Sequence, residues 1–122
     1  MVVVQQQVKV GERLELSLGQ GVKTWTRILA DGTKQYTMHC GPTERNVKCG
    51  AWVDEDFKRQ PGEVSVSADG VLVIPEAALV DAGDYWSDDQ PIPTQEVEGG
   101  YTATARTVIT VTVESPNTVI DN

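Results

Sequence analysis

The chain has 122 residues, the size of a single globular domain, and it is 39% hydrophobic and 23% charged, as is ordinary for globular proteins. Asp and Glu number 18 against 10 for Lys and Arg, so the formal net charge is −8. This balance argues against binding to nucleic acid or to an anionic membrane surface, because both require a basic face. No apolar run approaches the roughly 20 residues that span a bilayer, so membrane insertion is not expected.

The composition predicts one domain over residues 1–115, followed by a polar tail or linker over 116–122. The first residues, Met-Val-Val-Val, lack the basic segment and the cleavage site of a secretory signal. A cytosolic protein and a processed or excised chain both fit these ends.

Short runs of alternating apolar and polar residues recur along the chain and predict strands rather than helices. In the clearest run, Leu14, Leu16 and Leu18 alternate with Glu15 and Ser17. The strands expected in the first half of the chain cover residues 2–10, 14–18, 22–29 and 33–40, with a further short strand at 51–53.

Two Asp-Gly pairs predict hairpins. Asp31-Gly32 separates two of the expected strands and favours a two-residue type I′ turn, in which both central residues have positive φ. Asp69-Gly70 is a second hairpin signal, between an alternating run at 64–67 and a strand at 71–74.

The rest of the chain continues this pattern. One helical turn is expected at 75–80, a strand from 85, a long loop at 88–100 and a long final strand at 101–114. Each strand has one apolar face, and two antiparallel sheets packed face to face would bury these faces. The sequence therefore predicts an all-β sandwich.

The segment from Leu72 to Tyr85 resembles the E–F region of immunoglobulin-like domains. In that family an apolar strand and a short helical turn lead into Asp-x-Gly-x-Tyr-x-Cys, and Asp81, Gly83 and Tyr85 match its first three defined positions. Residues 8–18 resemble the preceding A′–B region.

The resemblance implies a two-sheet antiparallel Greek-key sandwich of the I- or V-set type. It implies that Trp25 packs in the core and that the Tyr85 hydroxyl donates to a nearby main-chain carbonyl, the arrangement known as a tyrosine corner. The two cysteine positions of the family hold Leu18 and Ser87, so the inter-sheet disulfide is absent. A buried Ser87 is expected to find a hydrogen-bond partner.

Cys40 and Cys49 are the only cysteines. As a disulfide they would close a short polar loop and stabilise the fold by about 2.5–3 kcal/mol in the chain-entropy account. A disulfide would indicate an oxidising compartment. Free thiols in a reducing cell are the alternative, and metal binding is disfavoured because His39 is the only histidine.

No catalytic constellation is apparent, so we expect no enzyme activity, cofactor or metal site. His39 on a strand is interpreted as a surface residue, since no nucleophile and acid are arranged around it by any known motif. The acidic runs, at 54–56 and at Asp81, Asp84, Asp88 and Asp89, are interpreted as solvated loops, although calcium also favours such oxygen donors.

Trp86 is the strongest candidate for a binding residue. If Tyr85 points into the core, Trp86 points outward on the sheet of strands C, F and G, where it could anchor a protein partner or be covered by the following loop. That loop, at the F–G position, is expected to contribute further contacts. The expected binding residues are Trp86, Asp88, Asp89, Gln90, Ile92, Thr94, Gln95 and Trp52, the last of which could instead cover the edge of the core.

These observations predict a protein-recognition module at the cell surface or outside the cell, acting in adhesion, as a receptor or as a secreted binder. The acidic surface favours a basic partner, and a homodimer is possible through edge strands. Two alternatives remain open. One is a structural module of an intracellular filament or muscle protein, located in the cytoplasm, and the other is a secreted enzyme inhibitor.

Overall fold

The fold is seen in a computed structural model that describes residues 2–90, 94–97, 100–103 and 106–115. Ile92 and the expected tail at 116–122 lie outside these residues. The elements, in chain order, are β1 (Val2–Lys9), β2 (Leu14–Leu16), β3 (Thr24–Leu29), β4 (Lys34–Met38), β5 (Ser65–Val66), β6 (Leu72–Ile74), a 3₁₀ helix η1 (Leu79–Asp81), β7 (Gly83–Trp86), β8 (Thr94–Val97), β9 (Gly100–Ala103) and β10 (Thr107–Glu114).

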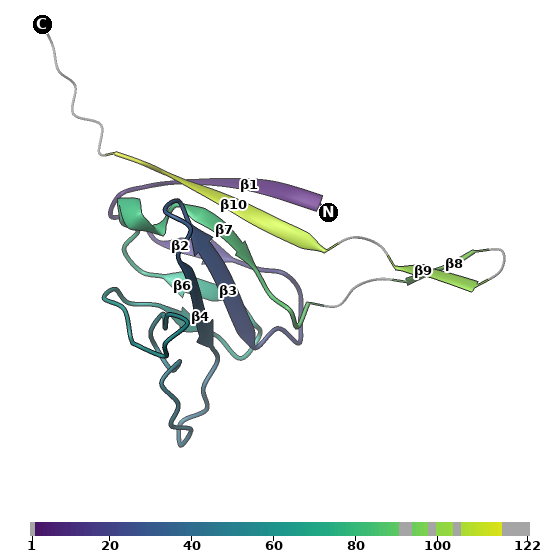
Figure 1. The fold of residues 1–122 in the computed structure, drawn as a ribbon, viewed down its shortest axis with the longest axis horizontal. Coiled ribbons are helices and arrows are strands. Elements are labelled where there is room, and N and C mark those ends of the chain that lie inside the picture. The colour runs from purple at the N-terminus through teal and green to yellow at the C-terminus, as the bar shows by residue number, and fades with distance from the viewer. Residues whose placement is uncertain (1, 91–93, 98–99, 104–105, 116–122) are drawn as a thin grey trace, which may run out of the picture.

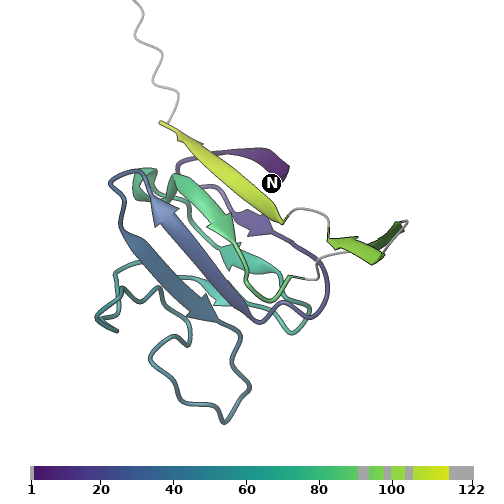
Figure 2. The same cartoon turned by 45° about the vertical axis from the view of Figure 1, so that its right-hand side comes forward.

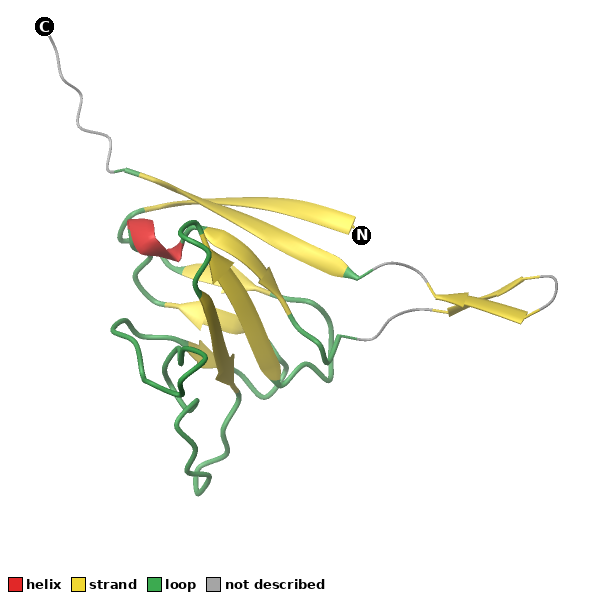
Figure 3. Ribbon diagram, viewed as in Figure 1, coloured by secondary structure: helices red, strands yellow, loops and turns green. Residues whose placement is uncertain are grey.

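Two sheets form the body of the molecule (Figure 1). One is five-stranded in the order β1-β10-β7-β3-β4, and the other is three-stranded in the order β2-β6-β5. The longest coil of the described chain lies between β4 and β5, and η1 is the one helical element in the described part of the chain (Figure 3). The predicted all-β, two-sheet sandwich is confirmed.

All strand pairs in these sheets are antiparallel except β1 with β10, which run parallel from Val2 opposite Thr107 to Lys9 opposite Glu114. The first strand of the chain therefore lies beside the last one, at one edge of the five-stranded sheet (Figure 2).

The long final strand predicted at 101–114 is two strands. Tyr101 and its neighbours pair with β8, in a hairpin registered from Thr94 opposite Ala103 to Val97 opposite Gly100. From Thr107 onward the chain pairs instead with β7 and β1. A uniform Thr/Val-rich sequence is compatible with both pairings, so the alternation alone did not reveal the change of partner.

The type I′ prediction at Asp31-Gly32 is wrong in detail. Of these two residues only Gly32 has positive φ, at 89°, and its N–H donates to the carbonyl of Leu29. The connection is therefore a three-residue loop, Ala30-Asp31-Gly32, with glycine at the left-handed position. The β5–β6 hairpin repeats this turn with the same tripeptide, ending at Gly70 with φ 86°.

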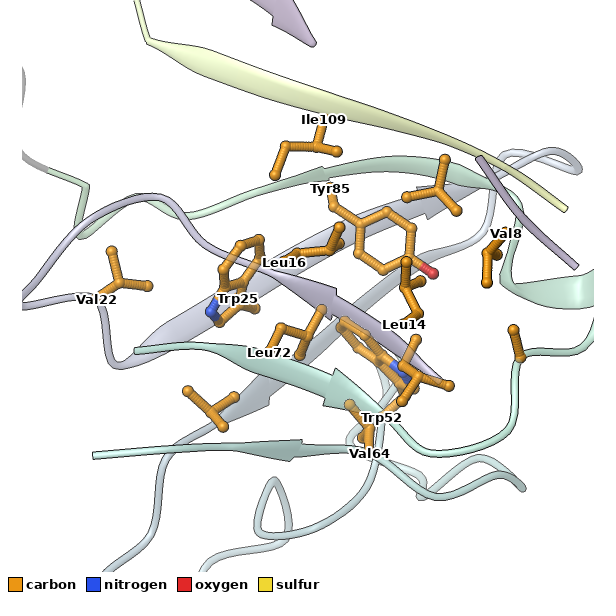
Figure 4. Packing of buried hydrophobic residues seen from close by; sticks show 14 residues of the cluster. Val8, Leu14, Leu16, Val22, Trp25, Trp52, Val64, Leu72, Tyr85 and Ile109 are labelled. Carbon is orange, nitrogen blue, oxygen red and sulfur yellow. The ribbon is translucent and has the colours of Figure 1, made fainter. Parts of the chain in front are cut away.

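The hydrophobic core fills the space between the sheets (Figure 4). Trp25 and Tyr85 are both fully buried, as the resemblance implies. Trp25 Nε1 donates to the carbonyl of Gly70 at 3.0 Å, which ties β3 to the β5–β6 turn across the core. The other buried members of the cluster are Val8, Leu14, Leu16, Val22, Trp52, Val64, Val66, Leu72, Ile74, Ala77, Ile109 and Val111.

The two positions where the family has cysteines are filled differently. Leu18 is half-buried against the core, and Ser87 is fully buried. The Ser87 hydroxyl accepts from the main-chain N–H of Asp89 at 3.0 Å, so its predicted hydrogen bond is present.

Cys40 and Cys49 form a disulfide. It holds the segment after β4 against that strand, where two isolated bridges pair Met38 with Cys49 and Tyr36 with Val53. The strand expected at 51–53 is reduced to these bridges. No helix in the described residues has the length and apolar character that a membrane crossing requires.

Candidate binding surface

The outer face of the five-stranded sheet, turned away from the three-stranded sheet, carries a row of apolar and aromatic side chains. Strand alternation places Tyr85 in the core and Trp86 on this outer face. The register sets Thr26 between Tyr36 on one side and Trp86 on the other. Val108 follows beyond Trp86 because Ile109 is opposite Tyr85 in the antiparallel β7–β10 pair.

A shallow hollow of about 330 Å³ lies on this face around Trp86. Its walls come from three neighbouring strands and from the residue just before β10: Ile28, Asp84, Trp86, Arg106 and Val108. Trp86 is half-buried and Ile28 is 36% exposed, so the floor of the hollow is apolar and reachable from solvent. None of the described residues of the F–G segment lines the hollow apart from Arg106.

Charged groups border this hollow and are held in place. Arg106 Nη1 lies 2.9 Å from Asp88 Oδ1, and Asp84 Oδ1 accepts from the hydroxyl of Thr110 at 2.8 Å. Lys34 Nζ lies 6.0 Å from the centre of the Trp86 ring. Asp88, which the sequence predicted as a binding residue, thus sits at the rim of the hollow, where ion pairs contribute little to stability and more to specificity.

Asp89 and Gln90 fasten the start of the F–G segment to the body of the molecule. Asp89 Oδ2 accepts from the hydroxyl of Thr24 at 2.7 Å and from two main-chain N–H groups. The Thr24 hydroxyl lowers the pKa of Asp89 more than partial burial raises it. Gln90 is 7% exposed, and its amide bonds both main-chain groups of Thr107.

Gln90 is therefore a structural residue, and its prediction as a contact residue is wrong because its amide is already bonded inside the molecule. Thr94 and Gln95 lie on β8, which pairs with β9 and with no other strand of the described chain. This hairpin extends beyond the Thr107 end of β10, away from both sheets (Figure 1).

Trp52 is also wrongly placed among the binding residues. It is 2% exposed and packs edge-on against Tyr85, with ring centres 5.8 Å apart. The disulfide-anchored segment that carries it folds inward over the core, which agrees with the alternative that Trp52 covers the core edge. Its indole N–H has no hydrogen-bond partner among the described residues.

A buried ion pair lies beside Trp52 and was not foreseen. Arg27 is 2% exposed, and its Nη1 lies 2.8 Å from Asp81 Oδ1 and 2.9 Å from the Tyr85 hydroxyl. The guanidinium stacks over the Trp52 ring, 4.1 Å from its centre. The alternation that buries Trp25 also buries Arg27 two residues later, and a buried arginine requires an acidic partner, so this signal was present in the sequence.

The tyrosine corner itself is formed. The Tyr85 hydroxyl donates to the main-chain carbonyl of Asp81 at 2.5 Å, and burial raises the pKa of Tyr85 to about 12 against the opposing effect of Arg27. Gly83 is required at its position because a side chain there would collide with the main chain of Ile28 and Leu29 in β3.

The remaining candidates have simple structural partners. His39 is half-buried, with Nδ1 2.7 Å from the carbonyl of Val66, instead of lying free on the surface. Asp54 accepts from the main-chain N–H groups of Asp56 and Lys58 and orders its own turn. Within the described residues no group of three or more His, Cys, Asp and Glu side chains is placed to hold a metal ion.

Comparison with known proteins finds structures with a similar fold but no matching sequence family. No family model matches the sequence, and no curated protein matches it significantly. The structure is similar to the extracellular fragment, including the stalk region, of Novel Immune-Type Receptor 11 from Ictalurus punctatus, with a TM-score of 0.51 and 17% identity over 97% of this chain and 90% of that one. The extracellular fragment of Novel Immune-Type Receptor 10 from the same organism gives a TM-score of 0.48 and 16% identity over 90% and 96%.

At such identity the first of these structures supports the fold alone. Together with the sheet order, the tyrosine corner and the buried Trp25, it is sufficient for that conclusion. The chain folds as an immunoglobulin-like β-sandwich.

Proposed function

We propose that this chain is a protein-recognition module that binds its partner through the outer face of the five-stranded sheet. The observation that carries the proposal is the apolar hollow around Trp86 on a molecule of net charge −8. A half-buried tryptophan in an apolar depression with a charged rim is the arrangement typical of an interface anchor. The β8–β9 hairpin, with Thr94 and Gln95, is proposed as a second contact.

The chemistry of the surface favours a protein partner with a basic patch. The hollow would take an apolar side chain, while Asp84 and the Asp88–Arg106 pair at the rim would select polar neighbours. The excess of carboxylates should accelerate association with a basic partner, and this acceleration should decrease as salt is added.

The Cys40–Cys49 disulfide supports a location at the cell surface or outside the cell, because cytosolic thiols are kept reduced. It weighs against the structural module of an intracellular filament, for which free thiols would be expected. We therefore place adhesion, receptor and secreted binding roles ahead of that alternative.

The test uses a library of cell-surface and secreted protein domains, screened with the intact chain and then measured by surface plasmon resonance. Trp86→Ala should weaken binding of a genuine partner at least tenfold, as for anchor residues in general. Phe57→Ala is the matched control, since Phe57 is another exposed aromatic, at 65%, but lies in the loop after β4. Circular dichroism confirms that both variants fold.

A partner that binds the Phe57→Ala variant as tightly as the wild type, but binds the Trp86→Ala variant at least tenfold more weakly, supports the proposal. A partner that is insensitive to Trp86→Ala, or that depends on Phe57 instead, assigns binding to another surface and contradicts it.

A further inference from the structure

The outer edge of β1 is an open strand edge, separate from the hollow around Trp86. β1 pairs with β10 along one side, and no strand of the described residues pairs with its other side (Figures 1 and 2). The opposite edge of the sheet is different, because the segment containing Cys49 and Val53 bridges to β4 there. β1 is thus the long edge strand that the fold leaves uncovered, and such edges are templates for strand addition.

The hydrogen bonds identify which main-chain groups face this edge. Val2 N–H donates to Arg106 and Val10 N–H to Glu114, so the even-numbered residues of β1 direct their main-chain groups toward β10. In a parallel ladder the intervening residues direct both groups the other way. Val3, Gln5 and Gln7 therefore face the open edge.

The open edge has a defined end at Lys9. The N–H of Lys9 donates to Glu12 Oε1 at 2.9 Å, and its carbonyl accepts from the N–H of Glu12 at 3.0 Å. The turn after β1 thus satisfies both groups of Lys9. What remains is a segment of three odd-numbered residues whose donors and acceptors have no main-chain partner within the described residues, and they alternate as an antiparallel partner strand requires.

We infer that the occupant of this edge is β1 of a second copy of the chain, paired antiparallel about a two-fold axis at Gln5. In this register Gln5 is opposite Gln5 of the other copy, and Val3 is opposite Gln7 at both ends. All three outward-facing residues of each copy are then used, giving about six main-chain hydrogen bonds. An interface of one surface with itself is the usual form of a symmetric dimer.

Charge and exposure favour a second copy. β1 contains no carboxylate although the chain carries a net charge of −8, and its one charged residue, Lys9, lies outside the paired segment. No like charges oppose each other across the axis, and such pairs would destabilise the interface. Val2 and Val4, exposed at 50% and 44%, would be partly covered by Val8 and Gln6 of the other copy.

The first measurement is sedimentation velocity of the full chain over a range of concentrations, at low and high salt. The expected result is a monomer–dimer equilibrium that shifts toward dimer at high salt, because screening reduces the repulsion between two acidic chains. A chain that stays monomeric up to millimolar concentration at high salt would overturn the inference.

Hydrogen exchange locates the interface. The amides of Val3, Gln5 and Gln7 should exchange rapidly in dilute solution and become protected as the dimer forms. Those of Val4 and Gln6, already bonded to β10, should be protected at every concentration. A dimer in which the odd-numbered amides remain unprotected uses another face and contradicts the inference.

Gln5→Pro is the decisive variant, with Gln5→Ala as its matched control. Proline removes an N–H that points to the open edge and is not part of the β1–β10 ladder, so the fold should tolerate it. Loss of the two central hydrogen bonds should raise the dimer dissociation constant at least tenfold, whereas Gln5→Ala keeps them. Equal dimerisation of the two variants would refute the inference.

A second variant covers the case in which Gln5→Pro does not fold. Gln5→Lys keeps the main-chain N–H and places two ammonium groups opposite each other across the axis. It should weaken the dimer at low salt and recover at high salt. If it dimerises as tightly as the wild type at low salt, the proposed register is wrong.

Discussion

Arg27 and Asp81 show how one buried pair constrains the whole core. Their side chains are 3% and 11% exposed, and the arginine also bonds Gln35 and the Tyr85 hydroxyl. An arginine remains charged under all ordinary conditions, so its burial depends on these partners. The guanidinium of Arg27 lies in the core, and the ring of Trp52 packs against it.

Asp81→Asn should lower the free energy of unfolding by about 3–5 kcal/mol, because it leaves the buried Arg27 without its counter-charge. The amide keeps the shape of the side chain but has one acceptor oxygen, whereas Asp81 accepts from both Arg27 and the N–H of Ala78, so the change removes the counter-charge together with one acceptor. Urea denaturation measures the difference. The control is Asp84→Asn, an exposed carboxylate bonded to Thr110, with an expected cost of less than about 1 kcal/mol. Equal costs would show that the buried charge is not the cause.

The raised pKa of Tyr85 leads us to expect that the free energy of unfolding decreases in alkaline solution. Burial raises its pKa to about 12 from the ordinary value of 10.0, so the unfolded chain ionises first as pH rises. The contribution of Tyr85 is complete below pH 10 and is lost between pH 10 and about 12, amounting to about 3 kcal/mol at most.

The measurement is the free energy of unfolding of wild type and Tyr85→Phe from pH 9 to 12. The wild type should decline more steeply than the phenylalanine variant. Parallel curves would mean that Tyr85 has a similar pKa in both states. At neutral pH the variant should itself lose about 1–3 kcal/mol, since Arg27 loses an acceptor and the Asp81 carbonyl a donor.

At the scale of elements, the same tripeptide, Ala-Asp-Gly, forms one turn that is exposed to solvent and one that packs against the body of the molecule. Both end in a left-handed glycine and both reverse a hairpin. Gly32 is open to solvent, with nothing near the position of a β-carbon. At Gly70 a β-carbon would lie 2.6 Å from the carbonyl oxygen of Val22, and the Gly70 carbonyl also accepts from Trp25.

Gly32→Ala should therefore cost about 1–2 kcal/mol, the strain of a left-handed alanine alone. Gly70→Ala has the same strain and must also displace Val22, so we expect at least twice that loss. Thermal unfolding of the two variants in parallel provides the comparison, in which each is the control for the other. A ratio near one would mean that the backbone at Gly70 relaxes freely.

At the scale of the whole molecule, the one disulfide links Cys40 to Cys49 and does not link the two sheets. The inter-sheet bridge of the family is absent, and Cys40–Cys49 instead holds the segment that carries Trp52 into the core. The bond acts on the unfolded chain through the closed loop and on the folded chain through this anchoring.

The double variant Cys40→Ser, Cys49→Ser should lose about 2.5–3 kcal/mol in the free energy of unfolding. In the double variant the near-ultraviolet circular dichroism signal of Trp52 should also weaken. In a Trp52→Phe variant, reduction of the disulfide should leave the near-ultraviolet signal unchanged. Intact mass after alkylation under non-reducing conditions establishes the starting state. Two alkylated thiols in protein that was never reduced would remove the support for an oxidising compartment.

The sequence by itself determined much of this protein. Alternation predicted the strands and the two-sheet sandwich. The resemblance of the Asp81-to-Tyr85 pattern implied the tyrosine corner, and with Tyr85 pointing into the core, alternation placed Trp86 on the outer face. These features depend on neighbours within a few residues, or on a pattern whose geometry is local. The disulfide prediction, left open against free thiols, was also confirmed.

Only the tertiary structure decided the rest, because it depends on which segments meet across the molecule. Parallel pairing of β1 with β10, the split of the final strand and the inward folding of Trp52 are choices between partners of equal local propensity. Gln90 carries no local sign that its amide meets Thr107 17 residues later. The hollow around Trp86 likewise exists because Ile28, Asp84 and Val108 come from strands that only the fold makes neighbours.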